Sequence, residues 1–277
     1  MLKQRVITAL VLIAVLLPAL FAAQAWPFSV LSLVLMAAAG WEWARLNGAA
    51  GAAVVLGAAL AAACAAALWA GWADAAPRAV WAAAALVWVF GGALVLAGGV
   101  SRWTRWPPTL RCALGAVLLW TAWLALAGAK SIGVNFILSV FCLVWAADIA
   151  AYFGGKAFGR RKLAPHISPG KSWEGVASGM LGAIALSAAW LWVDAAYPGH
   201  SSSLYTRLDR RWGGALGVLW VLALVALSVV GDLFESLVKR AAGAKDSSAL
   251  LPGHGGVLDR IDALLPVFPM ALALVAW

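Results

Sequence analysis

Residues 214–277 read GALGVLWVLALVALSVVGDLFESLVKRAAGAKDSSALLPGHGGVLDRIDALLPVFPMALALVAW. The quoted stretch begins and ends with apolar runs. The polar segment between them, residues 231–262, holds five acids, four bases, one histidine and a glycine cluster. A single Asp, Lys or Arg at the centre of a membrane helix costs about 2.5–3.5 kcal/mol. So many polar groups between two apolar runs indicate a functional site at a membrane boundary.

The composition of the whole chain supports this interpretation. Of its 277 residues, 65% are hydrophobic and 11% are charged, which excludes an ordinary soluble domain. A membrane helix needs about 20 apolar residues, and its backbone polar groups must be satisfied internally. We therefore predict an all-α, polytopic integral membrane protein of about nine transmembrane helices. The predicted spans are residues 6–25, 28–46, 51–72, 79–99, 109–129, 131–153, 175–195, 213–232 and 262–277.

Basic residues are distributed unevenly between the predicted loops. With a cytoplasmic N-terminus, fifteen of the twenty Lys and Arg residues lie on the cytoplasmic side, as the positive-inside rule requires. The other five are Arg78, Lys130, Arg207, Arg210 and Arg211. This topology predicts a multi-pass protein of a bacterial-type inner (plasma) membrane. The net charge of +9 then indicates orientation and contact with anionic membrane lipids, and no nucleic-acid partner is expected.

Two regions follow from the positions of the polar residues. Residues 1–130 are Ala- and Gly-rich helices, which we interpret as a scaffold that could also form a lipid-entry or dimer face. In this region Glu42 and Arg45 are most simply a pair at a helix end. Residues 131–277 form the predicted catalytic region, with cytoplasmic polar loops at 154–174 and 233–262.

The first half of the polar segment has a helical pattern. If the apolar run continues as a helix, its polar residues recur at i, i+3, i+4, i+7 and i+8 and share one face. They are Asp232, Glu235, Ser236, Lys239 and Arg240. The alternative interpretation is a solvated helix end with ion pairs between neighbouring turns.

Glycines and acids mark the second half of the segment. Gly255 and Gly256 follow His254, and glycine allows backbone N–H groups to approach an anion closely. Asp259 and Asp262, three residues apart, would share a face of the next helix and could hold a hard cation. An Asp near a helix start is also often a cap or a partner of the helix dipole. The combination, rather than any one feature, predicts a site.

The order of these residues resembles a known signature. Residues 236–240, SLVKR, are followed by Lys245-Asp246 and then by HGGVLDRID at residues 254–262. This run resembles the signature of the phosphatidate cytidylyltransferases, or CDP-diacylglycerol synthases, at each of its fixed positions. The match covers about a tenth of the chain. It is too long for chance to be a good explanation.

A second polar cluster precedes the predicted span 175–195. Asp148 lies in an apolar run, where a carboxylate needs a partner or an aqueous cavity. Four bases follow in residues 156–162, which could bind phosphates or lipid headgroups or simply anchor the loop. Residues 168–175, SPGKSWEG, resemble the second motif of the same family, a Ser-Pro-Lys-Lys-Thr-like segment followed by Trp-Glu-Gly. Gly170 replaces the first Lys and leaves Lys171 to act alone, and Ser172 keeps a hydroxyl that could also cap the next helix.

The resemblance implies an activity, cofactors and site residues. The reaction would be transfer of CMP from CTP to phosphatidic acid in phospholipid biosynthesis, with release of pyrophosphate. Both substrates are polyanions, so a divalent cation together with Lys and Arg would offset their repulsion. The resemblance implies Mg²⁺ held by Asp232 and Asp259, a second cation such as K⁺, and a homodimer. The candidate catalytic residues are Asp232, Asp259, Lys239, Arg240, Lys245, His254, Arg260 and Asp262. The candidate substrate-binding residues are Lys171, Ser172, Ser236, Asp246, Gly255, Gly256 and Asp148.

Two other classes of membrane protein are alternatives to a cytidylyltransferase, and each needs features that this sequence lacks or places elsewhere. CDP-alcohol phosphotransferases and prenyltransferases need Asp-rich motifs of the DGxxAR or DDxxD kind, which do not occur in the sequence. A transporter would need acids or helix breaks at mid-membrane in matching halves. The polar residues of this chain gather at one interface instead, which favours the enzyme.

Overall fold

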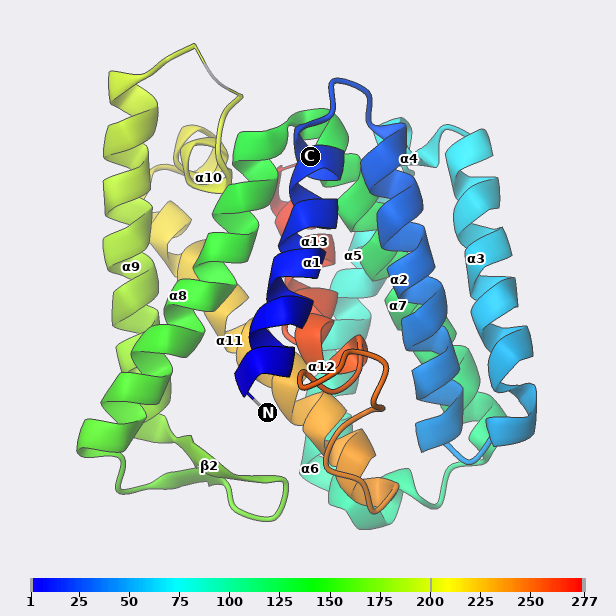
Figure 1. The fold of residues 1–277 in the computed structure, drawn as a ribbon. Helices are drawn as coiled ribbons and strands as arrows, with labels where there is room; N and C mark the ends of the chain where they lie inside the picture. Colours follow the sequence, from blue (N-terminus) through cyan, green and yellow to red (C-terminus); the bar gives the residue numbers. More distant parts are fainter. Residues whose placement is uncertain (1, 200, 276–277) are drawn as a thin grey trace.

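The computed structural model describes residues 2–199 and 201–275, and these are almost entirely helical (Figure 1). The long helices are α1 (Leu2–Phe21), α2 (Trp26–Leu46), α3 (Ala53–Trp69), α7 (Pro108–Ile132), α8 (Val134–Phe158), α9 (Trp173–Ala196) and α11 (Gly214–Ala241). The shorter ones are η1 (Ala50–Ala52), α4 (Trp72–Ala75), α5 (Arg78–Leu86), α6 (Gly92–Trp103), α10 (Leu204–Trp212), α12 (Leu258–Ile261) and α13 (Leu264–Val275). A π-helical turn, η2 (Val87–Gly91), joins α5 to α6. The prediction of an all-α membrane protein is confirmed.

Eight helical segments in the described residues are long and apolar enough to cross a membrane. They correspond to the first eight predicted spans, and α5, η2 and α6 together make one of them, Arg78–Trp103. The ninth predicted span, residues 262–277, is represented by α13, whose twelve residues are too few to be counted as a candidate span. The predicted count of about nine is therefore close to the observed one.

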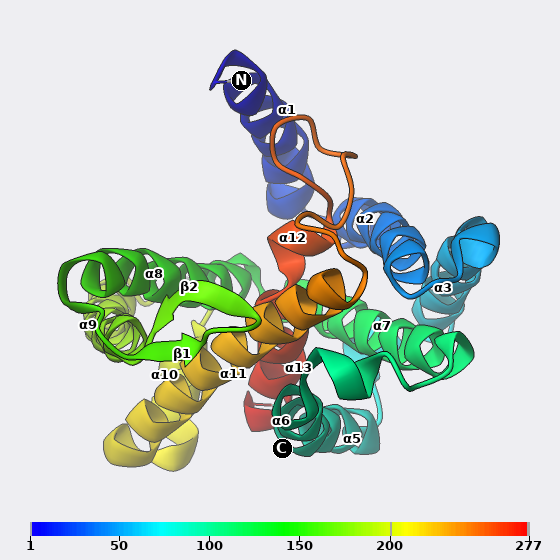
Figure 2. The ribbon, with the colours of Figure 1, turned by 90° about the horizontal axis from the view of Figure 1, so that it is seen from below.

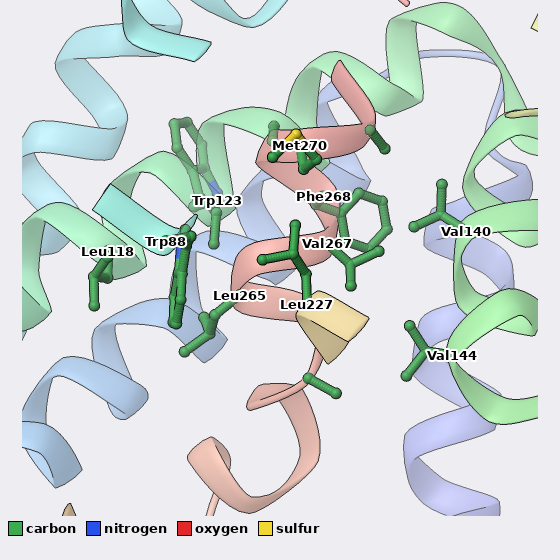
Figure 3. Packing of buried hydrophobic residues seen from close by; sticks show 14 of the residues in the cluster. Trp88, Leu118, Trp123, Val140, Val144, Leu227, Leu265, Val267, Phe268 and Met270 are labelled. Carbon is green, nitrogen blue, oxygen red and sulfur yellow. The ribbon is translucent and has the colours of Figure 1, made fainter. Parts of the chain in front are cut away.

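Helix α13 lies in the centre of the bundle. Nine of its twelve residues are buried, and it packs against α7, α11 and α5. Figure 3 shows Val267, Phe268 and Met270 of α13 among side chains from the surrounding helices, such as Trp123 and Val140. A helix that is apolar on all sides is expected to be buried, so α13 forms the hydrophobic core.

Helices α8 and α9 form the closest helix pair of the fold. A Cβ added to Gly179 of α9 would lie 2.8 Å from the carbonyl oxygen of Ala147 on α8, so only glycine allows this approach. The Gly154-Gly155 pair lies within α8, which continues to Phe158 and does not end at these glycines. The polar end of α8 is thereby held against the start of α9.

The polar loops gather at one end of the bundle. The loop after α8 contains a short antiparallel hairpin, β1 (Lys162–Ala164) and β2 (Ser168–Ser172), with Lys162 opposite Ser172. Figure 2 shows this hairpin beside α8, α9 and α11, and the loop between α11 and α12 beside α1 and α2. The start of α1 lies at the same end of the bundle (Figure 1). Both predicted polar loops therefore share one face of the protein.

Candidate active site

A cavity of about 430 Å³ lies where α8, the hairpin, α9 and α11 meet. Asp148 of α8, Lys171 of β2 and Asp232 of α11 line it, together with hydroxyls and glycines from the same elements. Gly170 also lines the cavity, and a Cβ added there would have no atom within 4 Å. The SPGKSWEG motif and Asp232, which are far apart in the chain, thus line one cavity at the polar end of the bundle.

An ion pair joins the SPGKSWEG motif to α11 across this cavity. Lys171 Nζ lies 2.6 Å from Asp232 Oδ2, and Ser236 Oγ donates a weaker hydrogen bond of 3.4 Å to Asp232 Oδ1. The Lys171 and Asp232 side chains are 24% and 28% exposed, so water and small anions can reach them. An ion pair this accessible contributes about 0–1 kcal/mol to stability. The pair is therefore available for exchange with a charged substrate.

The hairpin is fixed to α9 by its own capping groups. Ser172 Oγ accepts a hydrogen bond of 3.1 Å from the amide of Gly175, which is the predicted alternative role of this hydroxyl as a helix cap. The Glu174 carboxylate accepts from the amides of Arg160 and Arg161, at 3.1 and 3.2 Å. These bonds tie both ends of the hairpin to the start of α9, and Lys171 lies one residue before the capping Ser172.

A second charged cluster lies further along α11. Lys239 Nζ lies 2.6 Å from Glu235 Oε2 and 2.5 Å from Asp259 Oδ1. The Glu235 and Asp259 side chains are only 1% and 6% exposed, whereas Lys239 is 13% exposed. One partly exposed ammonium is thus shared between carboxyl groups from α11 and α12. The solvated helix end considered as an alternative is wrong for these residues, because they pair in the interior.

Asp259 also organises the loop before α12. Its Oδ2 accepts from the amide and hydroxyl of Ser247, at 2.8 and 2.9 Å, and from the amide of Gly256 at 2.8 Å. Burial opposes its ionisation, but the bonds from Lys239, Gly256 and Ser247 outweigh this, and the pKa of Asp259 is lowered. Asp259 therefore has a structural role in addition to any catalytic one.

The signature glycines are explained by close packing. Gly255 has φ +84°, a left-handed conformation that favours glycine, and a Cβ there would collide with Asp259 Oδ2. A Cβ on Gly256 would collide with Ser247 Oγ and with the carboxylate of Glu42. Since the Gly256 amide donates to Asp259, it is not free to bind an anion in this structure.

Glu42 of α2 was not identified as a site residue from the sequence. Its carboxylate is fully buried and accepts four hydrogen bonds, from Ser247, Ser248, Val257 and Leu258, at 2.6 to 3.1 Å. The predicted helix-end pair with Arg45 is wrong, because Arg45 is exposed and its guanidinium stacks 4.5 Å from the centre of the Trp41 ring. The one signal in the sequence was an acid next to Trp in an apolar run. The proposed division at residue 130 stays a prediction, although these contacts cross it.

The remaining signature residues lie around the two clusters. Arg240 donates to the carbonyl oxygens of Ile167 and Ala244, which joins the hairpin to the end of α11. Arg260 donates to the carbonyl oxygen of His254 at 2.7 and 3.1 Å. The exposed Lys245 and Asp246 lie in the loop after α11. The structure thus places every predicted site residue at the polar end of the bundle, in two neighbouring groups rather than one.

The fit of a divalent cation can be judged from the acids at this end. Within residues 2–199 and 201–275, no three Asp, Glu, His or Cys side chains are arranged to hold a metal by themselves. Mg²⁺ commonly needs only one or two carboxylates, with substrate phosphates and water as its other ligands. Burial and the charge of Asp232 raise the pKa of Asp262, in the turn before α13. Asp232 and Asp262 therefore share an electronegative region that suits a cation.

Comparisons with known proteins place the whole chain in one family. The model of the Cytidylyltransferase family matches residues 3–277. A phosphatidate cytidylyltransferase of Pseudomonas aeruginosa is 41% identical over 302 aligned positions, which cover 100% of this chain and 99% of the relative. One from Haemophilus influenzae is 51% identical over half of this chain and 44% of its own length. A chloroplastic phosphatidate cytidylyltransferase of Arabidopsis thaliana is 42% identical over 59% of this chain and 39% of its own. The family resemblance of the two motifs is therefore confirmed, and the chain belongs to the phosphatidate cytidylyltransferase family of nucleotidyltransferases.

Proposed function

We propose that this protein transfers CMP from CTP to phosphatidic acid, giving CDP-diacylglycerol and pyrophosphate. The observation that carries the proposal is the identity of 41% with the Pseudomonas aeruginosa phosphatidate cytidylyltransferase across the whole chain. The cavity between α8, β2 and α11 supports it, because acidic and basic side chains lie together at the polar end of an apolar bundle. A lipid phosphate held at this level could keep its acyl chains in the membrane while CTP enters from water.

The side chains of the cavity have the charges that this reaction needs. In-line nucleotidyl transfer depends on positioning and on neutralising charge, more than on covalent help from the protein. Lys171 would bind a phosphate once a substrate competes for its pairing with Asp232. Lys245 and His254, in the loop after α11, would bind the departing pyrophosphate. The attacking lipid phosphate is already ionised, so no protein base is needed.

A divalent cation belongs to the same proposal. Asp232 and Asp259 are the proposed ligands of Mg²⁺, with Asp262 as the neighbouring acid and K⁺ as a proposed second cation. When bound, Mg²⁺ would supply charge stabilisation at the α-phosphate of CTP. Both oxygens of Asp259 accept hydrogen bonds, so a cation at Asp259 would have to displace or share a donor. Of these donors only the Lys239 ammonium is positively charged, so a cation would compete with it first.

The activity itself is the first expected result. Purified protein in mixed micelles with phosphatidic acid, Mg²⁺ and CTP labelled in its α-phosphate should produce labelled CDP-diacylglycerol, and EDTA should abolish this. Thin-layer chromatography identifies the product. The matched control replaces phosphatidic acid by diacylglycerol, which lacks the phosphate and should give no labelled lipid. Labelled CDP-diacylglycerol that forms equally well in EDTA would contradict the role of the cation. If no CDP-diacylglycerol formed under conditions in which a phosphatidate cytidylyltransferase from the same family is active, the proposed reaction would be contradicted.

The sidedness of the site is a second expected result. We propose that the N-terminus and the active site face the cytoplasm, since the start of α1, the hairpin and the α11–α12 loop share one end of the bundle (Figure 1). A Cβ at Gly170 or at Gly199 would meet no atom within 4 Å, so Gly170→Cys and Gly199→Cys should fold normally. A membrane-impermeant maleimide should label Gly199→Cys in intact cells and Gly170→Cys only after permeabilisation. The reverse pattern would overturn the orientation.

The homodimer remains a proposal that rests on the family resemblance.

A further inference from the structure

Glu42 is an unusual acid for its surroundings. It lies on α2, in the region of the chain that carries none of the signature residues, and its side chain is fully buried. Within the part of the chain that the structure describes, no Lys, Arg or His pairs with it. A buried charge without a partner is costly, so its four hydrogen bonds have to offset its desolvation.

The four bonds join the two ends of the glycine-rich loop. Glu42 Oε1 accepts from Ser248 Oγ at 2.6 Å and from the Val257 amide at 2.9 Å. Glu42 Oε2 accepts from Ser247 Oγ at 3.1 Å and from the Leu258 amide at 2.8 Å. Residues 249–256, between these attachment points, include His254 and both signature glycines. One carboxylate therefore closes the loop at its base.

The same carboxylate is linked to the charged cluster on α11. Ser247 Oγ lies within hydrogen-bond distance of both Glu42 Oε2 and Asp259 Oδ2, and Asp259 binds Lys239. Glu42 is itself held rigidly, because its neighbour Trp43 is buried, stacks on Phe234 of α11 and donates to the carbonyl oxygen of Arg111. A rigid helix thus presents a fixed acceptor to a loop that has little regular structure of its own.

We propose that Glu42 is a positioning residue for CTP, which holds residues 247–258 so that the loop and Asp259 are arranged for the nucleotide before it binds. This inference rests on the proposed function. It requires a carboxylate in particular, because two of the partners are backbone amides that can only donate and each oxygen receives one of them. An amide in place of the carboxylate would set an NH₂ group against one of these N–H groups.

The deciding variant is Glu42→Gln, which keeps the size of the side chain. We expect kcat/KM for CTP to fall by about 10–100-fold, as for other groups that orient a site from behind it. KM for phosphatidic acid should change little, since none of the four residues that bind Glu42 lines the cavity between α8, β2 and α11. Arg45→Ala, one turn along α2 and exposed, is the matched control and should retain wild-type kinetics. Unchanged kcat/KM values for both substrates in Glu42→Gln would overturn the inference. So would an equal fall in both values that matches the fraction of unfolded protein.

A measurement without turnover separates this inference from the proposed function. Trypsin should cut after Lys245 faster in Glu42→Gln than in the wild type, while the thermal unfolding temperature stays close to that of the wild type. A wild-type protein that makes no CDP-diacylglycerol would sink the proposed function, whereas equal cleavage rates in wild type and Glu42→Gln would sink the role of Glu42.

Discussion

Replacing Asp232 by asparagine is expected to lower the turnover of CTP and phosphatidic acid by about 10²–10³-fold, the usual effect of removing one preorganised electrostatic group. Asp232 lines the cavity and is paired with Lys171 at 2.6 Å, so its charge acts where the polyanionic substrates are expected to meet. The thermal stability of Asp232→Asn should be close to that of the wild type, because the Lys171–Asp232 pair is about a quarter exposed and asparagine keeps an acceptor for Lys171. Initial rates and thermal unfolding in the same detergent measure both effects.

Asp209→Asn is the matched control for this substitution. Asp209 is exposed on α10, at the opposite end of the bundle from the hairpin (Figure 1), and its loss should leave turnover at the wild-type level. Asp259→Asn is a less selective test, because Asp259 also accepts three hydrogen bonds from Ser247 and Gly256. Wild-type turnover in Asp232→Asn would remove Asp232 from the reacting centre and with it the proposed cation ligand.

Replacing Lys239 by methionine is expected to have the largest effect on stability. Its ammonium is the shared partner of Glu235 and Asp259, and both carboxylates are more than 90% buried. Removing one partner of a buried ion pair typically costs about 3–5 kcal/mol, because the remaining charges stay buried without compensation. The free energy of unfolding should therefore fall by about this amount in denaturant titrations.

Two further variants test the cause of this loss. Lys245→Met removes a Lys that is exposed in the next loop and should leave the free energy of unfolding unchanged. Adding Glu235→Gln to Lys239→Met should restore part of the lost stability, because it removes one of the two buried carboxyl groups that lose their partner. An undiminished unfolding free energy in Lys239→Met would mean that water reaches these carboxylates, contrary to their burial.

The sequence predicted the components of the site better than their contacts. Lys171 was recognised from the SPGKSWEG motif and Asp232 from the helical pattern of the polar segment 231–262, and the structure brings them together at one cavity. Glu42 and Ser247 were missed, because Glu42 was interpreted as a helix-end partner of Arg45 and a serine in a polar loop has no distinguishing local pattern. Their role exists only when α2 lies beside the loop after α11, which is a contact between residues about two hundred positions apart.

The glycines were recognised for a reason different from the one the structure gives. A glycine-rich run predicts a backbone that can approach an anion. Gly256 instead makes room for Glu42 and Ser247, and its amide is bound to Asp259. Local sequence shows that a side chain is absent, but only the packing of other elements shows what fills the space.

Hydrophobicity by itself determined that the chain is an all-helical membrane protein, where its spans lie, and which two polar segments interrupt them. This follows because lipid forces each spanning backbone to satisfy its own hydrogen bonds, so that every helix is encoded locally. Tertiary structure decided that α13 forms the core, which carboxylate pairs with which lysine, and that Glu42 holds the loop. These depend on the order in which helices pack side by side, and apolar faces of similar composition do not specify that order.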